Sequence, residues 1–251
     1  MQIRKTFDKG RQLVRHSNLL WKNKGVLPAV TRGYFNTLVL QKTVLRTIEF
    51  AIVAECNVNC EMCYATKIVD KDKKRMTVDE YASVWQQAKK MGAFSVHLPG
   101  GEPTLRKDLP EIIGVFDPGK TIISMTTNSS VLRDGYLEKL RNAGLSCLHF
   151  SLNSPDPVVN DRQRDHVGHY DLVMQKIDEA VALDYEICLS IVVAKNNLAD
   201  VRKLVRLTKQ KGIGVVFSLA TPSGNWTGAT DELLDMDDWG GIDALIDSTP
   251  H

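Results

Sequence analysis

Three of the five cysteines in this 251-residue chain stand close together, in the stretch CNVNCEMCY at residues 56–64. Three residues separate Cys56 from Cys60, and two separate Cys60 from Cys63. Thiolates grouped in this way bind soft metal ions and iron–sulfur clusters. A cluster held by three thiolates keeps one iron open to a chelating molecule, whereas a fourth cysteine would close that position. Zinc is the alternative, but three cysteines without a neighbouring histidine fit a zinc site poorly.

The other two cysteines, Cys147 and Cys188, fall within predicted strands, and we expect them to be core residues. An odd number of cysteines with three clustered favours metal chemistry in a reducing compartment over a disulfide framework. No apolar run approaches the roughly 18 residues that a membrane-spanning helix needs, and the N-terminus lacks the apolar core of a secretory signal. We therefore expect a cytoplasmic protein.

The elements that must position these cysteines are short apolar strands alternating with amphipathic helices from residue 43 onward. The predicted strands are rich in Ile and Val, and several are nearly continuous apolar runs, as parallel strands buried on both faces are. They cover residues 43–53, 94–98, 120–126, 145–151, 185–193 and 213–220.

The helices between the strands have recognisable ends. Thr77 with Glu80 forms a capping box for a helix that ends near Met91, and Asn197 is placed to cap residues 198–211. Two more helices are predicted, one from Asp134 to just before Gly144 and one from Asp171 to Leu183. Strands and helices in strict alternation predict right-handed crossovers and a parallel sheet.

Six such units fit an α/β fold of the partial (β/α)6 TIM-like barrel type, with a doubly wound open sheet as the alternative. We divide the chain into a basic helical N-terminal extension (1–42), the barrel (43–227) and an acidic segment (228–251) expected to form a last helix. In a parallel barrel the loop after the first strand lies on the C-terminal face, where active sites are built. The cysteine stretch is that loop.

A second motif, PGGEPTL at residues 99–105, follows the second strand. CxxxCxxC after the first strand and GGEP after the second together resemble the radical S-adenosylmethionine (SAM) superfamily. The resemblance extends over residues 45–225 and includes the strand exits TTN (126–128), SLN (151–153), VVAKNN (192–197) and TPSG (221–224), as well as DRQRD (161–165). Ser129 and Asp165 stand where the family pattern has glycine, and Asn153 where it has aspartate.

The resemblance implies that Cys56, Cys60 and Cys63 hold a 4Fe-4S cluster whose fourth iron chelates S-adenosyl-L-methionine. It also implies a set of cofactor-binding residues: Met62 against adenine, Gly100 and Gly101 where backbone approaches the ligand closely, Glu102 toward the SAM ammonium, Pro103 stiffening the turn, Ser151 at the ribose and Arg164 at the SAM carboxylate. No catalytic side chain follows from the pattern.

The implied activity is reductive cleavage of SAM to a 5′-deoxyadenosyl radical that abstracts hydrogen from an organic substrate, with a low-potential reductant of the flavodoxin or ferredoxin type as partner. The alternative is a non-catalytic iron–sulfur electron carrier or redox sensor on the same fold. His149 shares a strand face with Ser151 by two-residue alternation, so it is either a substrate contact or a buried hydrogen-bonded residue, and the same two interpretations apply to His97.

The net charge of +2 conceals an asymmetry, since residues 1–50 carry ten Lys and Arg against two acids. Residues 1–24 form an amphipathic basic pattern that fits either a helix on anionic lipid, with a lipid-linked substrate, or a helix packed on the barrel. Few aromatic residues accompany these charges, so nucleic acid is not the expected partner. The sequence ends without a cysteine-rich extension, which weakens the expectation of a peptide substrate.

Overall fold

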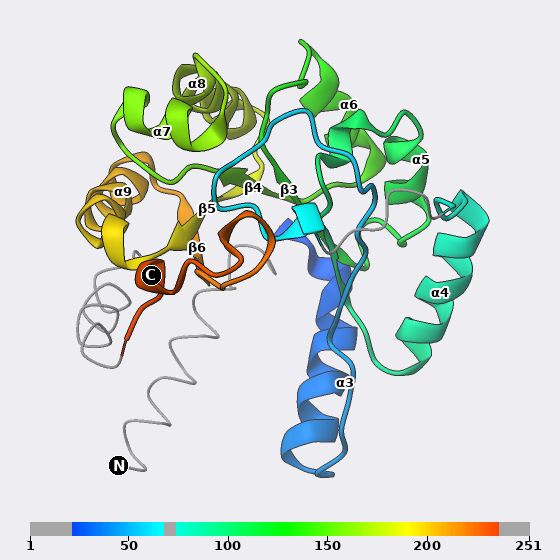
Figure 1. The fold of residues 1–251 in the computed structure, drawn as a ribbon. Helices are drawn as coiled ribbons and strands as arrows, with labels where there is room; N and C mark the ends of the chain where they lie inside the picture. Colours follow the sequence, from blue (N-terminus) through cyan, green and yellow to red (C-terminus); the bar gives the residue numbers. More distant parts are fainter. Residues whose placement is uncertain (1–21, 68–73, 236–251) are drawn as a thin grey trace.

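The computed structural model describes residues 22–67 and 74–235. Within them, six parallel strands form one sheet in sequence order, and helices cover its outer face as the sheet curls (Figure 1). The strands are β1 Thr47–Glu49, β2 Ser95–Leu98, β3 Ile122–Thr127, β4 Cys147–Ser151, β5 Glu186–Val193 and β6 Gly214–Leu219. This is a half-barrel, so the predicted partial TIM-like barrel is confirmed, and the doubly wound alternative is wrong.

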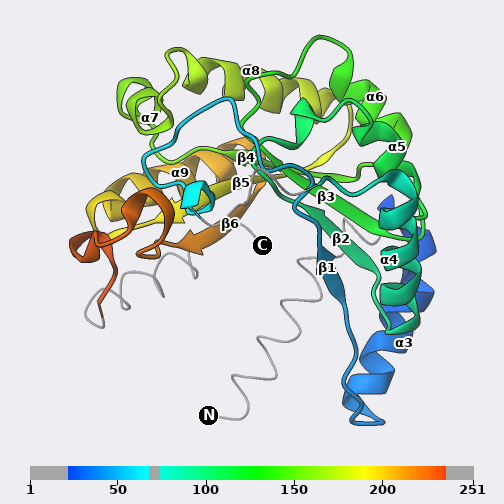
Figure 2. The ribbon, with the colours of Figure 1, turned by 45° about the vertical axis from the view of Figure 1, so that its right-hand side comes forward.

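The helices lie between the strands as predicted and wrap the convex side of the sheet (Figure 2). The α-helices are α3 Leu27–Leu38, α4 Val78–Lys90, α5 Leu109–Gly114, α6 Tyr136–Ala143, α7 Pro157–Arg164, α8 His169–Ala182 and α9 Leu198–Lys211. Short 3₁₀ helices are η1 Lys24–Val26, η2 Ala65–Lys67, η3 Pro103–Leu105, η4 Lys195–Asn197, η5 Gly224–Trp226 and η6 Thr230–Glu232.

The capping box at Thr77 is present, with both of its reciprocal hydrogen bonds. Two predicted caps are wrong. Gly135 and not Asp134 precedes α6, and Gly168 precedes α8, where Asp171 lies in the first turn. The first backbone amides of α8 instead bond to a side chain from the preceding helix. The Asp161 carboxylate accepts from Gly168 N at 2.5 Å and from Tyr170 N at 2.9 Å.

The first strand is shorter than predicted, although the chain remains extended beyond it. Phe50 N still donates to His97 O at 2.9 Å, and Ile52 N donates to Pro99 O at 2.9 Å. The backbone after β1 therefore follows β2 up to the GGEP turn. This pairing brings the cysteine loop next to that turn.

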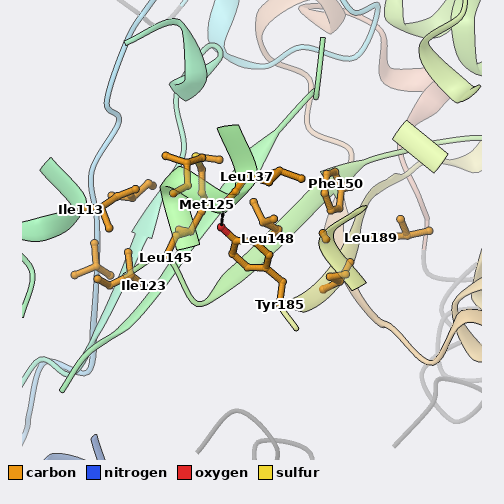
Figure 3. Packing of buried hydrophobic residues seen from close by; sticks show 14 of the residues in the cluster. Ile113, Ile123, Met125, Leu137, Leu145, Leu148, Phe150, Tyr185 and Leu189 are labelled. Carbon is orange, nitrogen blue, oxygen red and sulfur yellow. Dashed lines mark hydrogen bonds between the residues drawn. The ribbon is translucent and has the colours of Figure 1, made fainter. Parts of the chain in front are cut away.

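The apolar core lies between the sheet and the outer helices. Alternate residues of the central strands, including Ile123, Met125, Leu148, Phe150 and Leu189, point into it and are fully buried. Figure 3 shows these side chains packed with residues of the helices and with Tyr185, whose hydroxyl donates to Leu137 O at 2.8 Å. The sequence had suggested strands that are apolar on both faces. The inner face instead carries hydroxyl and imidazole groups toward the barrel interior.

Two predicted segments fall largely outside the described residues. The basic pattern at 1–24 is described only from residue 22, whereas α3 confirms a helix elsewhere in the 1–42 extension. Residues 228–235 contain the short η6 turn, and 236–251 lie outside the described part, so the last helix stays a prediction. None of the described helices combines the length and apolar character needed to cross a membrane.

Candidate cofactor site

The three loop cysteines border one cavity of about 540 Å³ with the other motif residues. Its walls include Met62, Gly100, Gly101, Ser151 and Arg164, together with Asn128. Of the predicted cofactor residues, Glu102 and Pro103 do not line it. The cavity continues from the loop into the strand interior, where His97, His149 and several serines and threonines face it. Its volume is within the range of about 300–1,000 Å³ that is usual for small-ligand sites.

A turn after β6 holds the cysteine loop from outside. Asn225 donates from its side chain to Cys60 O at 2.8 Å and from its backbone to Cys63 O at 2.9 Å, and Thr66 donates to Asn225 Oδ1 at 2.8 Å. Gly224 has φ +61°, and a Cβ there would lie 2.1 Å from Cys63 O, so this turn requires glycine. The sequence predicted a strand exit at 221–224 but gave Asn225 no role. Its position directly after that exit was the available signal.

Two polar side chains lie against the cysteine sulfurs. Asn128 Nδ2 lies 3.5 Å from Cys56 Sγ, and Arg164 Nη1 lies 3.6 Å from Cys60 Sγ. Hydrogen bonds to sulfur are one means by which proteins tune iron–sulfur clusters. Arg164 Nε is buried without a hydrogen-bond partner among the described residues, so the guanidinium keeps donor capacity for an anionic group.

The Gly-Gly pair is needed because backbone approaches backbone. A Cβ on Gly101 would lie 2.1 Å from Glu55 O, and one on Gly100 would lie 2.8 Å from Val53 O. Gly101 N donates to Val53 O at 2.7 Å, which fixes the turn against the chain leaving β1. We predicted glycine here for close approach to a ligand. The crowding that the structure shows is with the chain's own backbone at residues 53–55, just before the cysteine loop.

Glu102 is fully buried beneath the turn, where its carboxylate is saturated by protein donors. Oε1 accepts from Thr104 N (3.1 Å), Thr104 Oγ1 (2.6 Å) and Thr127 Oγ1 (2.8 Å), and Oε2 accepts from Asn128 N (2.7 Å). Burial raises the pKa of Glu102, and these hydrogen bonds oppose that rise. The carboxylate ties the turn to the exit of β3, and Pro103 starts η3 beside it. A contact with the SAM ammonium stays a prediction.

The two interior histidines stack on one another, with ring centroids 5.0 Å apart and planes inclined by 31°. His97 Nδ1 lies 2.9 Å from Ser124 Oγ, and Nε2 lies 3.2 Å from Thr126 Oγ1. Burial, and to a smaller extent the nearby His97, lowers the pKa of His149 to about 4. His149 is therefore neutral at pH 7. It faces the cavity from β4, two residues before Ser151 on the same strand face.

The departures from the family pattern have visible backbone consequences. Ser129 has φ +67° and Asp165 has φ +52°, so two non-glycine residues occupy the left-handed region where the pattern has glycine. Aspartate tolerates that region better than serine, because its short side chain bonds locally. Asn153 is fully buried, and its Oδ1 accepts from Val192 N at 3.1 Å. The chain keeps the turns and carries strain at two of them.

The family model described as "Radical SAM superfamily" matches residues 51–208, which include both motifs and the strands β2 to β5. The chain belongs to the radical SAM superfamily. Members of this superfamily use a 4Fe-4S cluster and SAM.

Individual relatives are more distant. The GTP 3′,8-cyclase of Staphylococcus saprophyticus is 27% identical over 208 residues, which are 76% of this chain and 61% of that protein. The chain thus spans about three fifths of that relative. Streptococcus suis SuiB bound to its precursor peptide SuiA has a TM-score of 0.68 at 18% identity, covering 81% of this chain and 46% of SuiB. SuiB bound to S-adenosylmethionine has a TM-score of 0.65 at 16% identity, covering 88% of this chain and 51% of SuiB. These two likenesses show the fold.

The residues around the cavity fit both cofactors. Three thiols and no fourth cysteine line it among the described residues, which suits a cluster with one open iron. The buried Arg164 Nε without a partner suits a carboxylate nearby. Cys56, Cys60 and Cys63 would hold the cluster, and Arg164 with the Gly100–Gly101 backbone would hold SAM beside it.

Proposed function

We propose that this radical SAM enzyme abstracts a hydrogen atom from an organic substrate held inside the half-barrel. When bound, the cluster and SAM supply the 5′-deoxyadenosyl radical for this step, after one electron from a reductant. One observation carries the proposal: the cysteine loop and the strand interior border a single cavity. An electron carrier or redox sensor has no use for a cavity of about 540 Å³ next to its cluster, so this alternative is disfavoured.

The chain's own residues would position the reacting groups. Arg164 would pair with the SAM carboxylate through its fork of N–H donors, and Ser151 at the end of β4 would donate to the ribose. Met62, which is buried beside the cysteines, would pack on adenine. The strand interior would hold the substrate and exclude water from a highly reactive species.

The cavity's lining indicates the chemical class of the substrate. Its described part carries one cationic side chain, Arg164, and one carboxylate, Glu49, with neutral hydroxyl and imidazole groups elsewhere. The hydroxyl groups belong to Thr47, Tyr64, Ser95, Ser124, Thr126, Thr127, Ser151, Ser190 and Ser218. A nucleoside triphosphate needs several cations or a metal ion around its phosphates. We therefore propose an uncharged, hydroxyl-bearing substrate and not GTP.

Deuterium transfer tests this proposal directly. Small-molecule extracts from cells grown in D₂O are fractionated and incubated with the reduced enzyme and unlabelled SAM. A fraction of uncharged polar molecules should place deuterium in 5′-deoxyadenosine, because the abstracted atom comes from substrate carbon. GTP should change neither the rate of SAM cleavage nor the products. If GTP accelerates cleavage and is itself converted, the proposed substrate class is wrong.

We also propose that a flavodoxin- or ferredoxin-type protein delivers the electron at the cysteine loop, where Cys56 is exposed. Single-turnover reduction by flavodoxin should slow when acidic or basic residues around this loop are exchanged, while reduction by dithionite should not. Equal slowing with both reductants would place the docking surface elsewhere.

An anionic membrane surface is the partner that we propose for the N-terminal extension. Large apolar side chains of α3 and the residues after it are exposed: Leu27 (41%), Phe35 (52%), Leu38 (63%), Val39 (61%) and Leu40 (46%). Exposed Arg32 and Lys42 flank them, and the far end of α3 extends beyond the sheet in both views (Figures 1 and 2). Apolar contact combined with positive charge is what binds a helix to anionic lipid.

Cosedimentation with anionic liposomes measures this contact. Binding should weaken as salt screens the charges, and it should fall when residues 1–24 are removed or when Phe35 and Leu38 are changed to serine. SAM cleavage without substrate should survive both changes. If the full-length protein ignores anionic liposomes at low salt, the proposed membrane contact is wrong.

A further inference from the structure

A second group of metal-binding side chains lies inside the barrel, away from the cysteine loop. Cys147 and His149 on β4 and Cys188 on β5 each offer one ligand atom, and these atoms all lie within 4.8 Å of one another. Two-residue alternation puts Cys147 and His149 on the same strand face as Ser151, and Cys188 on the same face as Ser190. Both serines line the cavity, so all three side chains point to the barrel interior.

The surroundings leave room for these sulfurs. Gly214 on β6 pairs with Cys188, and a Cβ at Gly214 would lie 2.8 Å from Cys188 Sγ. The Cys147 thiol is buried and hydrogen-bonded to the Cys188 thiol. The neighbours Leu148 and Leu189 point the other way, into the apolar core. Cys147 is buried, as predicted for a core residue, and Cys188 is half-buried. Both nevertheless lie on the interior face of the sheet and outside the apolar cluster under the outer helices.

We propose that Cys147, His149 and Cys188 bind one divalent zinc-type cation just beneath the cavity, which His149 lines and the two cysteines do not. Two thiolates and one imidazole are the ligands that such a borderline-soft ion prefers, and ligand atoms at this spacing need only small side-chain movements to reach tetrahedral geometry. Binding releases the protons of both thiols. Three protein ligands leave a fourth position that an exchangeable water or another donor fills, as in catalytic zinc sites.

The fourth position gives the site a use, and this step rests on the proposed function. His149 lines the cavity as well as completing the ligand group. A hydroxyl, amine or thiol of a substrate inside the barrel can replace the water on the cation. The cation would then fix one end of the substrate below the SAM site and so select which C–H bond faces the radical.

Cobalt binding to a protein without its cluster ligands tests the site. The full-length chain carrying C56A, C60A and C63A is reduced, freed of metal and titrated with Co²⁺. We expect one Co²⁺ per chain, with tetrahedral d–d bands and thiolate-to-cobalt charge-transfer absorption, and displacement by Zn²⁺. In this background, C147A, C188A or H149N should each weaken binding by more than the roughly 100-fold that loss of an outer-shell group costs. The matched control, H97N, should keep the thiolate–cobalt spectrum.

Thermal unfolding in the absence of metal shows which variants are folded. If a cysteine variant is unfolded, the Co²⁺ affinity of H149N decides the test. The proposal is overturned if the parent protein binds no Co²⁺, if binding is equal in H149N and its parent, or if Cys147 and Cys188 form a disulfide under the reducing conditions. The cluster-free protein cannot cleave SAM. This result is therefore independent of radical chemistry, which is tested separately on the wild-type protein.

Discussion

The loop cysteines and the strand cysteines are held in place by different kinds of contact. Cys60 and Cys63 lie in a loop fixed by Asn225 and by the end of α7, through hydrogen bonds to backbone groups. Cys147 and Cys188 are fixed by the sheet itself, because their positions follow from strand register and alternation. The loop at the rim of the barrel thus depends on a few hydrogen bonds, whereas the interior depends on the whole folded sheet.

This difference has a functional consequence. A site on the rim can accommodate a cluster and SAM through local loop geometry, at the cost of strained turns at Ser129 and Asp165. A site within the strands is rigid before any ligand arrives, which suits the positioning of a substrate. We therefore expect substitutions at the rim to change cofactor binding and those in the interior to change substrate chemistry.

Replacing the loop cysteines should have the largest effect. Cys56→Ala, Cys60→Ala or Cys63→Ala should each abolish SAM cleavage, because the cluster loses one of its three ligands. Cys147→Ala and Cys188→Ala should keep cluster iron and substrate-free SAM cleavage, since they lie outside the loop. Iron analysis and 5′-deoxyadenosine measured by mass spectrometry check this. Loss of cluster iron in Cys147→Ala would contradict the distinction between the loop cysteines and the strand cysteines.

Glu102→Ala tests how strongly the rim depends on one buried carboxylate. Its removal leaves the donors of Thr104, Thr127 and Asn128 unpaired. The free energy of unfolding should fall by about 3 kcal/mol or more. Each donor left unpaired costs on the order of 1–3 kcal/mol, and rearrangement of the neighbouring groups recovers part of the sum. Glu102→Gln should cost less. Exposed Glu111→Ala is the control and should stay within about 0.5 kcal/mol in urea unfolding. Equal effects at both sites would contradict the account.

The barrel was predictable from sequence because its determinants are local. The apolar strands, the capping box at Thr77 and the glycine ends at Gly144 and Gly212 each specify an element without distant contacts. The cap of α8 was mispredicted because the actual partner, Asp161, is seven or more residues away from the amides that it satisfies. Local capping rules do not cover such bonds.

The site was predictable only as far as its motifs. Cys56 and Gly101 belong to recognisable patterns. The role of Asn225 depends on its contact with Cys60, which is 165 residues away in the sequence. The saturation of Glu102 by protein donors likewise depends on the approach of β3 to the turn. Alternation correctly placed His149 beside Ser151, yet it could not show that Cys188 lies close to both His149 and Cys147. Register between strands decides that.

Arg164→Ala should weaken SAM binding about 10- to 100-fold, because a hydrogen-bonded charge is worth roughly 1.5–3 kcal/mol. The cluster should keep its iron, since Arg164 contacts Cys60 Sγ but is not a ligand. Exposed Arg162→Ala is a matched control on the same helix. Isothermal titration with SAM measures both. Unchanged affinity in Arg164→Ala, or equal losses in both variants, would remove Arg164 from the cofactor site.

Restoring glycine at the strained turns should have the smallest effect. Ser129→Gly should stabilise the protein by about 0.5–1 kcal/mol, because the relief of left-handed strain exceeds the added entropy of the unfolded chain. Asp165→Gly should gain less, since aspartate tolerates that conformation. Urea unfolding of both variants gives the comparison. Destabilisation of both would show that the side chains, and not the backbone, govern these turns.

The central claim is that the loop cysteines and the cavity together perform radical SAM chemistry. The most direct measurement is anaerobic reconstitution of the wild-type protein with iron and sulfide, followed by dithionite and SAM, with 5′-deoxyadenosine and methionine quantified by mass spectrometry. We predict about four irons per chain at the loop site and formation of both products in equal amounts. Stoichiometric zinc on the loop cysteines, no cluster and no 5′-deoxyadenosine would contradict the account.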